Sequence, residues 1–298
     1  MDNLYLMAGA HLASSTAVLF PGQGSQSPDM EAKVIAVRPD LVDLAREVVG
    51  EDPFGRVNDG TRFQQPAIFC AALAGWECLR GLELEPAALA GHSLGEIVAL
   101  TAAGALEESD ALRLVAARGR LMQEAGDSSG ETGMLAVRTS RDRIEGLSNT
   151  LGLTLANDNA PEQVVIAGPL DALGHAAERL RGDGIRSVRL PVAGAFHSPA
   201  MDSAADGLAA EVAAIGIRTP RIPVYSCLTA APFDDIAAGL VDGLTRPVHW
   251  LDTMRAMQAD GIDRFVETGP GKVLTGLVRK SLKGVEALTA ADLKAAYA

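Results

Sequence analysis

The sequence predicts an α/β fold with a largely parallel sheet, into which a smaller subdomain of different element order is inserted. Short apolar runs typical of buried strands, such as Thr16–Phe20, alternate with segments of helical periodicity. A G-x-S-x-G segment at residues 91–95 has the spacing of a sharp turn from a strand into a helix. The α/β pattern gives way to a different order of predicted elements at residue 127 and resumes at residue 195. These observations together predict two subdomains.

The large subdomain is predicted to comprise residues 16–126 and 195–298. Its first strand, Thr16–Phe20, ends in a glycine-rich loop at residues 21–26, and a second strand at Ala87–Gly91 leads into the turn at Ser93. Helical periodicity covers residues 40–49, 65–81, 94–104 and 108–124. The pattern resumes with helices at 199–215 and 272–282 and strands at 222–226 and 263–268.

The small subdomain is predicted to comprise residues 127–194. It opens with the polar break Asp127–Gly130. A strand, a helix, two strands, a helix and a strand are then predicted at 133–138, 140–150, 153–156, 163–167, 170–183 and 185–191. This β-α-β-β-α-β order is that of a ferredoxin-like unit, and its length of about 70 residues lies within the usual range of domains.

The composition excludes several function classes. The formal net charge of −12 argues against nucleic acid as a partner, because a phosphate backbone requires a basic surface. No apolar stretch of about 20 residues is present, so no membrane span is expected. Residues 1–15 lack the positively charged start of a signal peptide, so a cytoplasmic enzyme is expected. Three cysteines without paired spacing predict neither a disulfide framework nor a metal site.

Ser93 is the candidate nucleophile. Gly91 and Gly95 flank it in the turn, where they would relieve backbone crowding. The helix that follows directs free N–H groups and a partial positive charge toward the serine oxygen. An acyl group on Ser93 would therefore lie beside an electrophilic backbone.

A serine nucleophile needs a base, and elimination among the five histidines favours His197. His197 follows a predicted strand and precedes a helix start, with small residues before it. No acidic residue stands at an obvious strand end of the large sheet between Ser93 and His197. A backbone carbonyl can also fix the imidazole tautomer, and we favour that arrangement.

Arg118 lies on the predicted helix at 108–124, with Ala116, Ala117 and Gly119 around it. An arginine on a helix face is usually a solvated or ion-paired surface group. If this guanidinium reaches the Ser93 pocket instead, it can hold a substrate carboxylate through two parallel hydrogen bonds. Spacing alone leaves both interpretations open.

Five segments in order resemble the malonyl-CoA:acyl carrier protein transacylases, the acyltransferases of fatty acid and polyketide synthesis. They extend from about residue 16 to 282, nearly the whole chain. They are Phe20–Gln26 (FPGQGSQ), Gly91–Glu96 (GHSLGE), Arg118–Gln123 (RGRLMQ), Ala195–Ser198 (AFHS) and Glu267–Lys272 (ETGPGK). The resemblance implies an α/β-hydrolase-like large subdomain with a ferredoxin-like insertion.

The resemblance also implies a role for each matching residue. Ser93 would accept the acyl group, His197 would be its general base, and Arg118 would bind the malonyl carboxylate. The backbone N–H groups of Gln23 and Leu94 would form the oxyanion hole. The carbonyl that orients the histidine would be that of Gly243, where the family usually has glutamine.

Three further residues would line the substrate pocket. Asn157 and Asn159 match an N-x-N segment of the family. Phe196, just before His197, goes in the family with malonyl selection, because its ring leaves little space for a methyl branch at the α-carbon. One methyl group is worth only about 1–3 kcal/mol, so the preference need not be absolute.

The expected reaction is ping-pong transfer of a malonyl group from malonyl-CoA, through an ester on Ser93, to the phosphopantetheine thiol of an acyl carrier protein, with no bound cofactor. A serine hydrolase or thioesterase and a non-catalytic carrier-protein-binding homologue are the alternatives. An acidic carrier protein would need a local basic patch on this acidic chain. Two sets of basic residues are candidates: Arg179, Arg181, Arg186 and Arg189, and Lys272, Arg279, Lys280 and Lys283.

Overall fold

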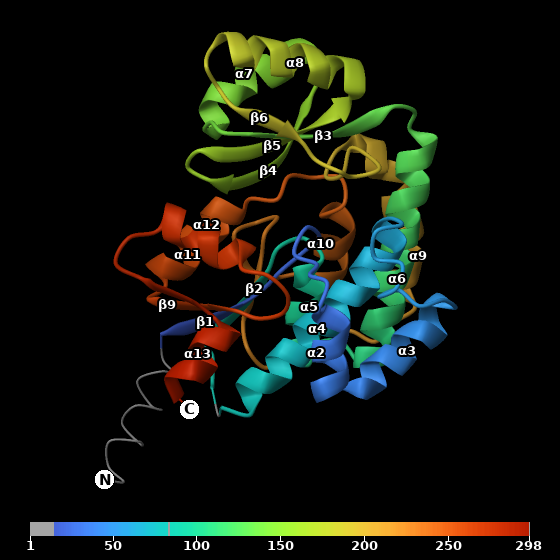
Figure 1. Cartoon of the computed structure of the whole chain (residues 1–298), viewed down its shortest axis with the longest axis vertical. Helices are drawn as coiled ribbons and strands as arrows, with labels where there is room; N and C mark the ends of the chain where they lie inside the picture. The colour runs from blue at the N-terminus through green and yellow to red at the C-terminus, as the bar shows by residue number, and fades with distance from the viewer. Residues whose placement is uncertain (1–14, 83, 298) are drawn as a thin grey trace.

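Two β-sheets organise the computed structural model of the chain, which describes residues 15–82 and 84–297 (Figure 1). The larger sheet has six strands in the order β10-β9-β1-β2-β7-β8. All neighbours in it are parallel except β7 and β8. Its strands are β1 (Thr16–Phe20), β2 (Ala88–Gly91), β7 (Val224–Ser226), β8 (Ala231–Pro232), β9 (Arg264–Glu267) and β10 (Glu286–Thr289). The predicted parallel α/β fold is therefore confirmed.

Helices cover both faces of this sheet, which explains why its central strands are apolar without alternation. Val18 and Phe20 face one hydrophobic cluster, and Ala17 and Leu19 face another. The first cluster includes residues of α2 (Met30–Val37), α3 (Pro39–Val49), α4 (Thr61–Arg80), α5 (Gly95–Ala102), α6 (Glu108–Ser128), α9 (Asp202–Ala213), α10 (Ile236–Asp242) and α13 (Ala290–Tyr297). The second includes residues of α11 (Trp250–Ala259) and α12 (Val273–Ser281).

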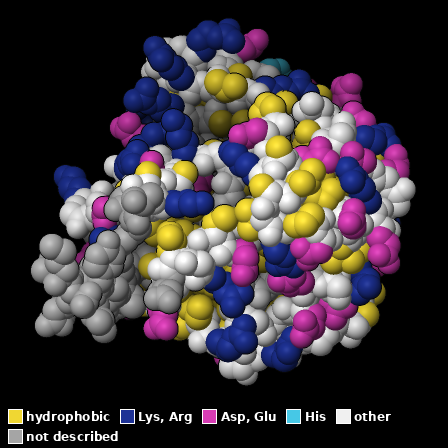
Figure 2. All heavy atoms as spheres, turned by 60° about the horizontal axis from the view of Figure 1, so that its bottom comes forward, with side chains coloured by type: hydrophobic (Ala, Val, Ile, Leu, Met, Phe, Trp, Pro, Cys, Tyr) yellow, Lys and Arg dark blue, Asp and Glu magenta, His cyan; other side chains and the backbone are white. Residues whose placement is uncertain are grey.

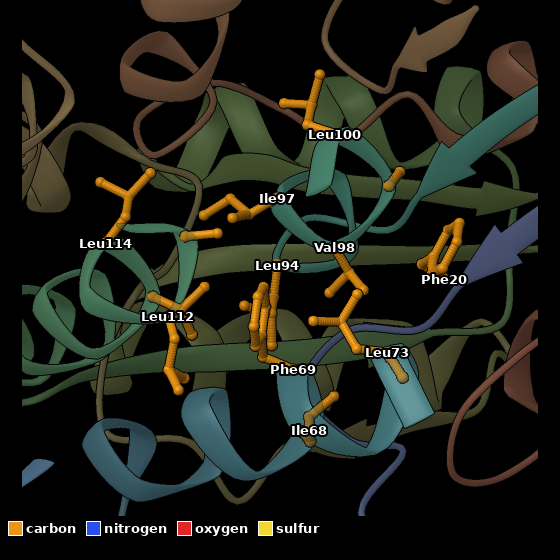
Figure 3. Close-up of a cluster of buried hydrophobic side chains, with 14 of the residues drawn as sticks. Phe20, Ile68, Phe69, Leu73, Leu94, Ile97, Val98, Leu100, Leu112 and Leu114 are labelled. Atoms are coloured by element: carbon orange, nitrogen blue, oxygen red, sulfur yellow. The ribbon is translucent and has the colours of Figure 1, made fainter. Parts of the chain in front are cut away.

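Packing in the first cluster holds the turn after β2 in place. Leu94 is fully buried, and its side chain lies among those of α4 and α5, beside Phe69 (Figure 3). Ile97 and Val98 of α5 extend the same packing. Leu94 is therefore anchored in the core by its side chain.

The smaller sheet has four antiparallel strands in the order β4-β5-β3-β6. They are β3 (Thr132–Val137), β4 (Thr154–Ala160), β5 (Gln163–Pro169) and β6 (Ser187–Arg189), and the helices α7 (Arg141–Leu151) and α8 (Leu170–Gly182) complete the unit. Leu135 and Ile166 pack with these helices in a cluster of their own. Met134 and Val165, on the other face, join the large core.

The two sheets are linked beside the end of β4. The N–H of Val248 donates to the carbonyl of Ala156 at 2.9 Å, and the N–H of Asp158 donates to the carbonyl of Val248 at 2.9 Å. Arg141 forms ion pairs with Asp158 at 3.3 Å and with Asp252 at 3.1 Å. The chain before α11 is thereby held against the small sheet.

The structure adds elements that periodicity did not predict and moves some boundaries. The helices α2, α10 and α13 and the strands β8 and β10 are new, and the predicted strand at 185–191 shortens to Ser187–Arg189. The predicted helix at 199–215 begins as a 3₁₀ turn, Pro199–Met201, before α9. Because α6 continues to Ser128, it crosses the proposed subdomain boundary at residue 127. Within 15–82 and 84–297, no helix is long and apolar enough to cross a membrane. The expectation for residues 1–15 lies, apart from Ser15, outside the described residues.

Candidate active site

Ser93 sits on a strained turn between β2 and α5. Its φ of +53° is a left-handed value that a non-glycine residue adopts at a cost. A Cβ atom on Gly91 would overlap the backbone of Gly95, and one on Gly95 would overlap the carbonyl of Phe20. The two glycines are therefore required because the backbone approaches too closely for any side chain.

His197 lies in hydrogen-bond contact with Ser93. Its Nε2 atom is 2.9 Å from Ser93 Oγ, and its Nδ1 atom is 2.8 Å from the carbonyl oxygen of Gly243. A carbonyl only accepts, so Nδ1 carries the proton and donates to Gly243. Nε2 is then left to accept the proton of the Ser93 hydroxyl, which is the arrangement a general base needs.

Burial keeps this imidazole neutral. Desolvation, with a smaller contribution from the positive charge of Arg118, lowers the pKa of His197 to about 3. His197 is 6% exposed and, like Ser93, has a positive φ of 58°. The ring is therefore neutral at neutral pH, with the proton on Nδ1 and Nε2 free to accept one.

Arg118 does not lie on the solvated face of α6. It is 4% exposed, and its Nη2 atom donates to Ser93 Oγ at 2.9 Å. Its Nη1 atom donates to Gln65 Oε1 on α4 at 2.8 Å, and Gln65 Nε2 lies 3.2 Å from Met122 Sδ. Burial lowers the pKa of Arg118 to about 10, so the guanidinium is still charged at neutral pH. In the described part of the chain it has no carboxylate partner within 4.0 Å.

Glu96 is a buried carboxyl behind the turn. It is 5% exposed, and its Oε1 atom accepts the backbone N–H of Cys227 at 2.8 Å. Burial raises the pKa of Glu96 to about 7, against the opposing effects of that hydrogen bond and of Arg118. Sequence reasoning missed both Glu96 and Gln65, although Glu96 ends the same GHSLGE segment as Ser93.

A cavity of about 200 Å³ opens over Ser93. Its lining includes Ser93, His197 and Arg118, the predicted residues Gln23, Leu94, Asn157 and Phe196, and two methionines, Met122 and Met134. Asn157 of β4 and Met134 of β3 come from the small sheet, whereas Ser93 and Leu94 follow β2 of the large sheet.

The backbone N–H groups of Gln23 and Leu94 are available to a ligand. Neither has a hydrogen-bond acceptor within residues 15–82 and 84–297. A side chain at Gly22 would overlap the carbonyl of His92, so the loop containing Gln23 passes directly against the turn of Ser93.

Asn159 departs from the expectation, because it does not line this cavity. Its Oδ1 atom is 2.8 Å from His92 Nε2, so it contacts the neighbour of the serine instead. Register shifts between Leu155 and Asn157 and between Asp158 and Ala160 break the alternation of β4. Asn157 and Asn159 are two residues apart on β4, but because of these shifts they do not take equivalent positions in the strand.

Two other histidines, His175 and His249, do not contact Ser93. His175 is exposed on α8. His249 precedes α11, where its N–H donates to the carbonyl of Cys227 at 2.7 Å. Among the described residues, no group of three or more His, Cys, Asp or Glu side chains could hold a metal ion.

The fold and the comparison with known sequences define an acyltransferase. Residues 40–296 match the acyl transferase domain family, and the chain belongs to that family.

The relatives include proteins of about the same length as this chain and longer proteins of which it covers only a part. The chain is 37% identical to the malonyl CoA-acyl carrier protein transacylase of Salmonella typhimurium, over 93% of this chain and 95% of the relative. It is 42% identical to the polyketide biosynthesis protein ThaF of Burkholderia thailandensis, over 90% of this chain but only 24% of that longer protein. A solved acyl carrier protein S-malonyltransferase from Vibrio cholerae superposes with a TM-score of 0.88 at 36% identity, covering 95% of this chain and 100% of the other.

Proposed function

We propose that the protein transfers a malonyl group from malonyl-CoA to the phosphopantetheine thiol of an acyl carrier protein. One observation carries the proposal: a single hydroxyl, Ser93 Oγ, contacts both a neutral base, His197, and the guanidinium of Arg118, which has no carboxylate partner among the described residues. A base beside the hydroxyl supports nucleophilic attack, and a buried cation beside it supports an acyl group that carries a negative charge.

The first half-reaction acylates the enzyme. His197 Nε2 takes the hydroxyl proton as Ser93 Oγ attacks the thioester carbonyl. The N–H groups of Gln23 and Leu94 stabilise the oxyanion of the tetrahedral intermediate, a contribution of about 3–4 kcal/mol per donor in comparable sites. The intermediate collapses as His197 returns the proton to the leaving thiolate, so CoA departs as its thiol and the malonyl ester of Ser93 remains.

The second half-reaction reverses these roles. His197 takes the proton of the carrier protein's thiol, and the sulfur attacks the ester carbonyl. Collapse returns the proton to Ser93 Oγ and releases the malonyl thioester. The cavity of about 200 Å³ limits the water beside the ester, which favours a thiol acceptor over hydrolysis. All of these steps proceed without a bound cofactor, and we place the enzyme in the cytoplasm.

Intact-mass analysis tests the proposed function. Incubation with malonyl-CoA is expected to add one malonyl group to the protein, and later addition of holo-acyl carrier protein is expected to remove it and malonylate the carrier. Loss of the label to water at the same rate with and without carrier would support the thioesterase alternative. Failure to label would support a non-catalytic carrier-binding protein.

Phe196→Ser is expected to relax selection against methylmalonyl-CoA. Phe196 is 5% exposed in the lining of the cavity, next to His197, and serine would free the volume of the ring. Since one methyl group in a pocket is worth about 1–3 kcal/mol, the ratio of methylmalonyl to malonyl acylation should rise about tenfold or more. Competition between the two thioesters, read by intact mass, measures the ratio.

Phe196→Leu is the matched control, because it keeps an apolar side chain of intermediate volume and should give a smaller shift. An unchanged ratio in Phe196→Ser would remove the ring from substrate selection.

A further inference from the structure

The first turn of α4 contacts two separate parts of the active site. On one side, Gln64 lines the catalytic cavity and Gln65 Oε1 accepts the N–H of Arg118 Nη1 at 2.8 Å. On the other side, Thr61, which begins the helix, is 1% exposed, and its Oγ1 atom accepts a hydrogen bond from Gln23 Nε2 at 3.2 Å. Since Gln23 is one of the two proposed oxyanion donors, a single helical turn lies between that donor and the buried guanidinium.

The loop that carries Gln23 reaches the surface at its tip. Gly24 is exposed and has a φ of +99°, a left-handed value that favours glycine. Ser25 Oγ donates to the carbonyl of Gly22 at 2.7 Å, which closes the base of the loop. In the described part of the chain, the side chain of Gln23 makes one hydrogen bond, the one to Thr61. That bond therefore connects the exposed tip of the loop to α4.

The position of Thr61 is set by α6, the helix that carries Arg118. A Cβ atom on Gly119 would lie 2.9 Å from the carbonyl oxygen of Thr61 and 3.1 Å from Arg62 Cα, so α6 approaches the turn as closely as glycine allows. One helical turn further on, Gln123 Oε1 accepts the backbone N–H of Arg62 at 3.2 Å. The first N–H groups of a helix have no partner within the helix, and α4 has no side-chain cap from its own N-cap residue. Gln123 therefore supplies from α6 an acceptor that the start of α4 lacks.

The outer side of the same turn is held by exposed charges, which contribute less. Arg56 and Arg62 place their guanidinium carbons 4.3 and 4.7 Å from the centroid of the Phe63 ring. Arg62 also pairs with Glu51 at 3.4 Å, and both side chains are exposed. Figure 2 shows Lys and Arg side chains next to Asp and Glu side chains over much of the face in view, so such neighbours are common on this surface. Because exposed ion pairs add little stability, the buried contacts with α6 fix the turn.

We propose that Thr61 is a positioning residue for the oxyanion hole: its hydroxyl holds the side chain of Gln23, so that the backbone N–H of Gln23 faces the reacting carbonyl in both half-reactions. This inference rests on the proposed function, in which that N–H stabilises the tetrahedral oxyanion. A donor lowers the barrier only when its position is fixed before the reaction, and small misplacements are costly. Thr61 acts through Gln23 and does not itself touch the substrate.

Thr61→Val tests the proposal, because it removes the hydroxyl and keeps nearly the same shape. Loss of an oxyanion donor costs about 100-fold to 1,000-fold, and a donor that is loosened but still present should cost about tenfold. The maximal rate of single-turnover acylation should fall by this factor with malonyl-CoA and acetyl-CoA alike, while the concentration that gives half the maximal rate stays unchanged. Transfer from the malonyl-enzyme to the small thiol N-acetylcysteamine should slow by the same factor, since the same donors serve both half-reactions.

Two further variants separate the hydroxyl from general effects on folding. Thr61→Ser keeps the hydroxyl and should retain nearly the wild-type rates. Thr253→Val is the matched control, because it removes the hydroxyl of another buried threonine, one that donates to the carbonyl of His249 at 2.8 Å and has no contact with the loop of Gln23. It should leave all three rates unchanged. Thermal unfolding of each variant measures any loss of stability.

Gln23→Met removes the same hydrogen bond from its other end and keeps the backbone N–H of residue 23. It should slow the three reactions as Thr61→Val does, and it still tests the proposal if Thr61→Val does not fold. The double variant should be no slower than the slower single variant, because both substitutions break one contact.

The outcomes distinguish this inference from the proposed function. Unchanged rates in Thr61→Val and Gln23→Met, with a wild-type enzyme that forms the malonyl ester, would overturn the positioning role alone. A loss confined to malonyl-CoA would also overturn it, since the effect would then pass through Gln65 and Arg118. The same loss in Thr61→Ser would show that the hydroxyl is not the cause. A wild-type enzyme that forms no malonyl ester would overturn the proposed function and the positioning role together.

Discussion

Ser93→Ala is expected to abolish formation of the malonyl-enzyme. Ser93 Oγ is the atom that meets both His197 Nε2 and Arg118 Nη2, each at 2.9 Å, so its removal leaves the site without a nucleophile. Loss of the nucleophile in a comparable serine site lowers turnover by about 10⁶-fold, and a fall of at least about 10⁴-fold is expected here. The release of CoA and the mass of the protein after incubation with malonyl-CoA measure it.

His197→Ala should cost nearly as much, and Ser93→Ala/His197→Ala little more than either alone, because the two residues act as a unit. Ser198→Ala is the matched control: it removes a buried hydroxyl next to His197 that donates to the carbonyl of Ala195 at 2.6 Å, away from the reacting atoms. This variant should still become malonylated. A malonyl group retained on Ser93→Ala would disqualify the residue as the nucleophile.

Those parts of the site that follow from local backbone geometry could be predicted from the sequence. The spacing of Gly91, Ser93 and Gly95 encodes the turn, since the crowding that requires glycine arises within five residues and from the adjacent strand β1. The absence of an acidic residue at a suitable strand end correctly left a backbone carbonyl as the partner of His197 Nδ1.

The residues that escaped prediction act through contacts between distant segments. Gln65 reaches Arg118 only because α4 packs against α6, a pairing across 53 positions. Glu96 meets Cys227 across 131 positions, and periodicity gives no sign of either contact. Asn159 was misplaced because a bulge in β4 changes which side chains share a face, and nothing in its N-x-N pattern marks the bulge.

Short elements were missed for a related reason. β10 has four residues and β8 has two, lengths at which neither apolar alternation nor a turn signal can be distinguished from loop. Their position is set by pairing: β10 pairs with β9, from which α12 separates it, and β8 pairs with β7 across a short turn. Tertiary contact therefore decides these strands more than local propensity does.

Arg118→Ala is expected to weaken malonyl transfer about 100-fold or more while changing acetyl transfer about threefold or less. A buried guanidinium that pairs with a carboxylate contributes about 2–5 kcal/mol, and only the malonyl group carries that carboxylate. Single-turnover acylation with malonyl-CoA and acetyl-CoA measures both rates. Arg120→Ala is the matched control on the same helix, because Arg120 is exposed and pairs with Glu124 instead.

The comparison of the two thioesters separates two roles that the structure gives Arg118. Its Nη2 atom already donates to Ser93 Oγ, so it could act by lowering the pKa of the hydroxyl as well as by binding the substrate carboxylate. An effect on the hydroxyl would slow malonyl and acetyl transfer equally, and equal losses would therefore exclude the carboxylate role. Gln65→Leu removes the acceptor of the other donor, Nη1, while leaving the charge in place. This variant changes only the orientation of the guanidinium. If the guanidinium binds the carboxylate, the variant should therefore raise the KM for malonyl-CoA and leave acetyl transfer unaffected.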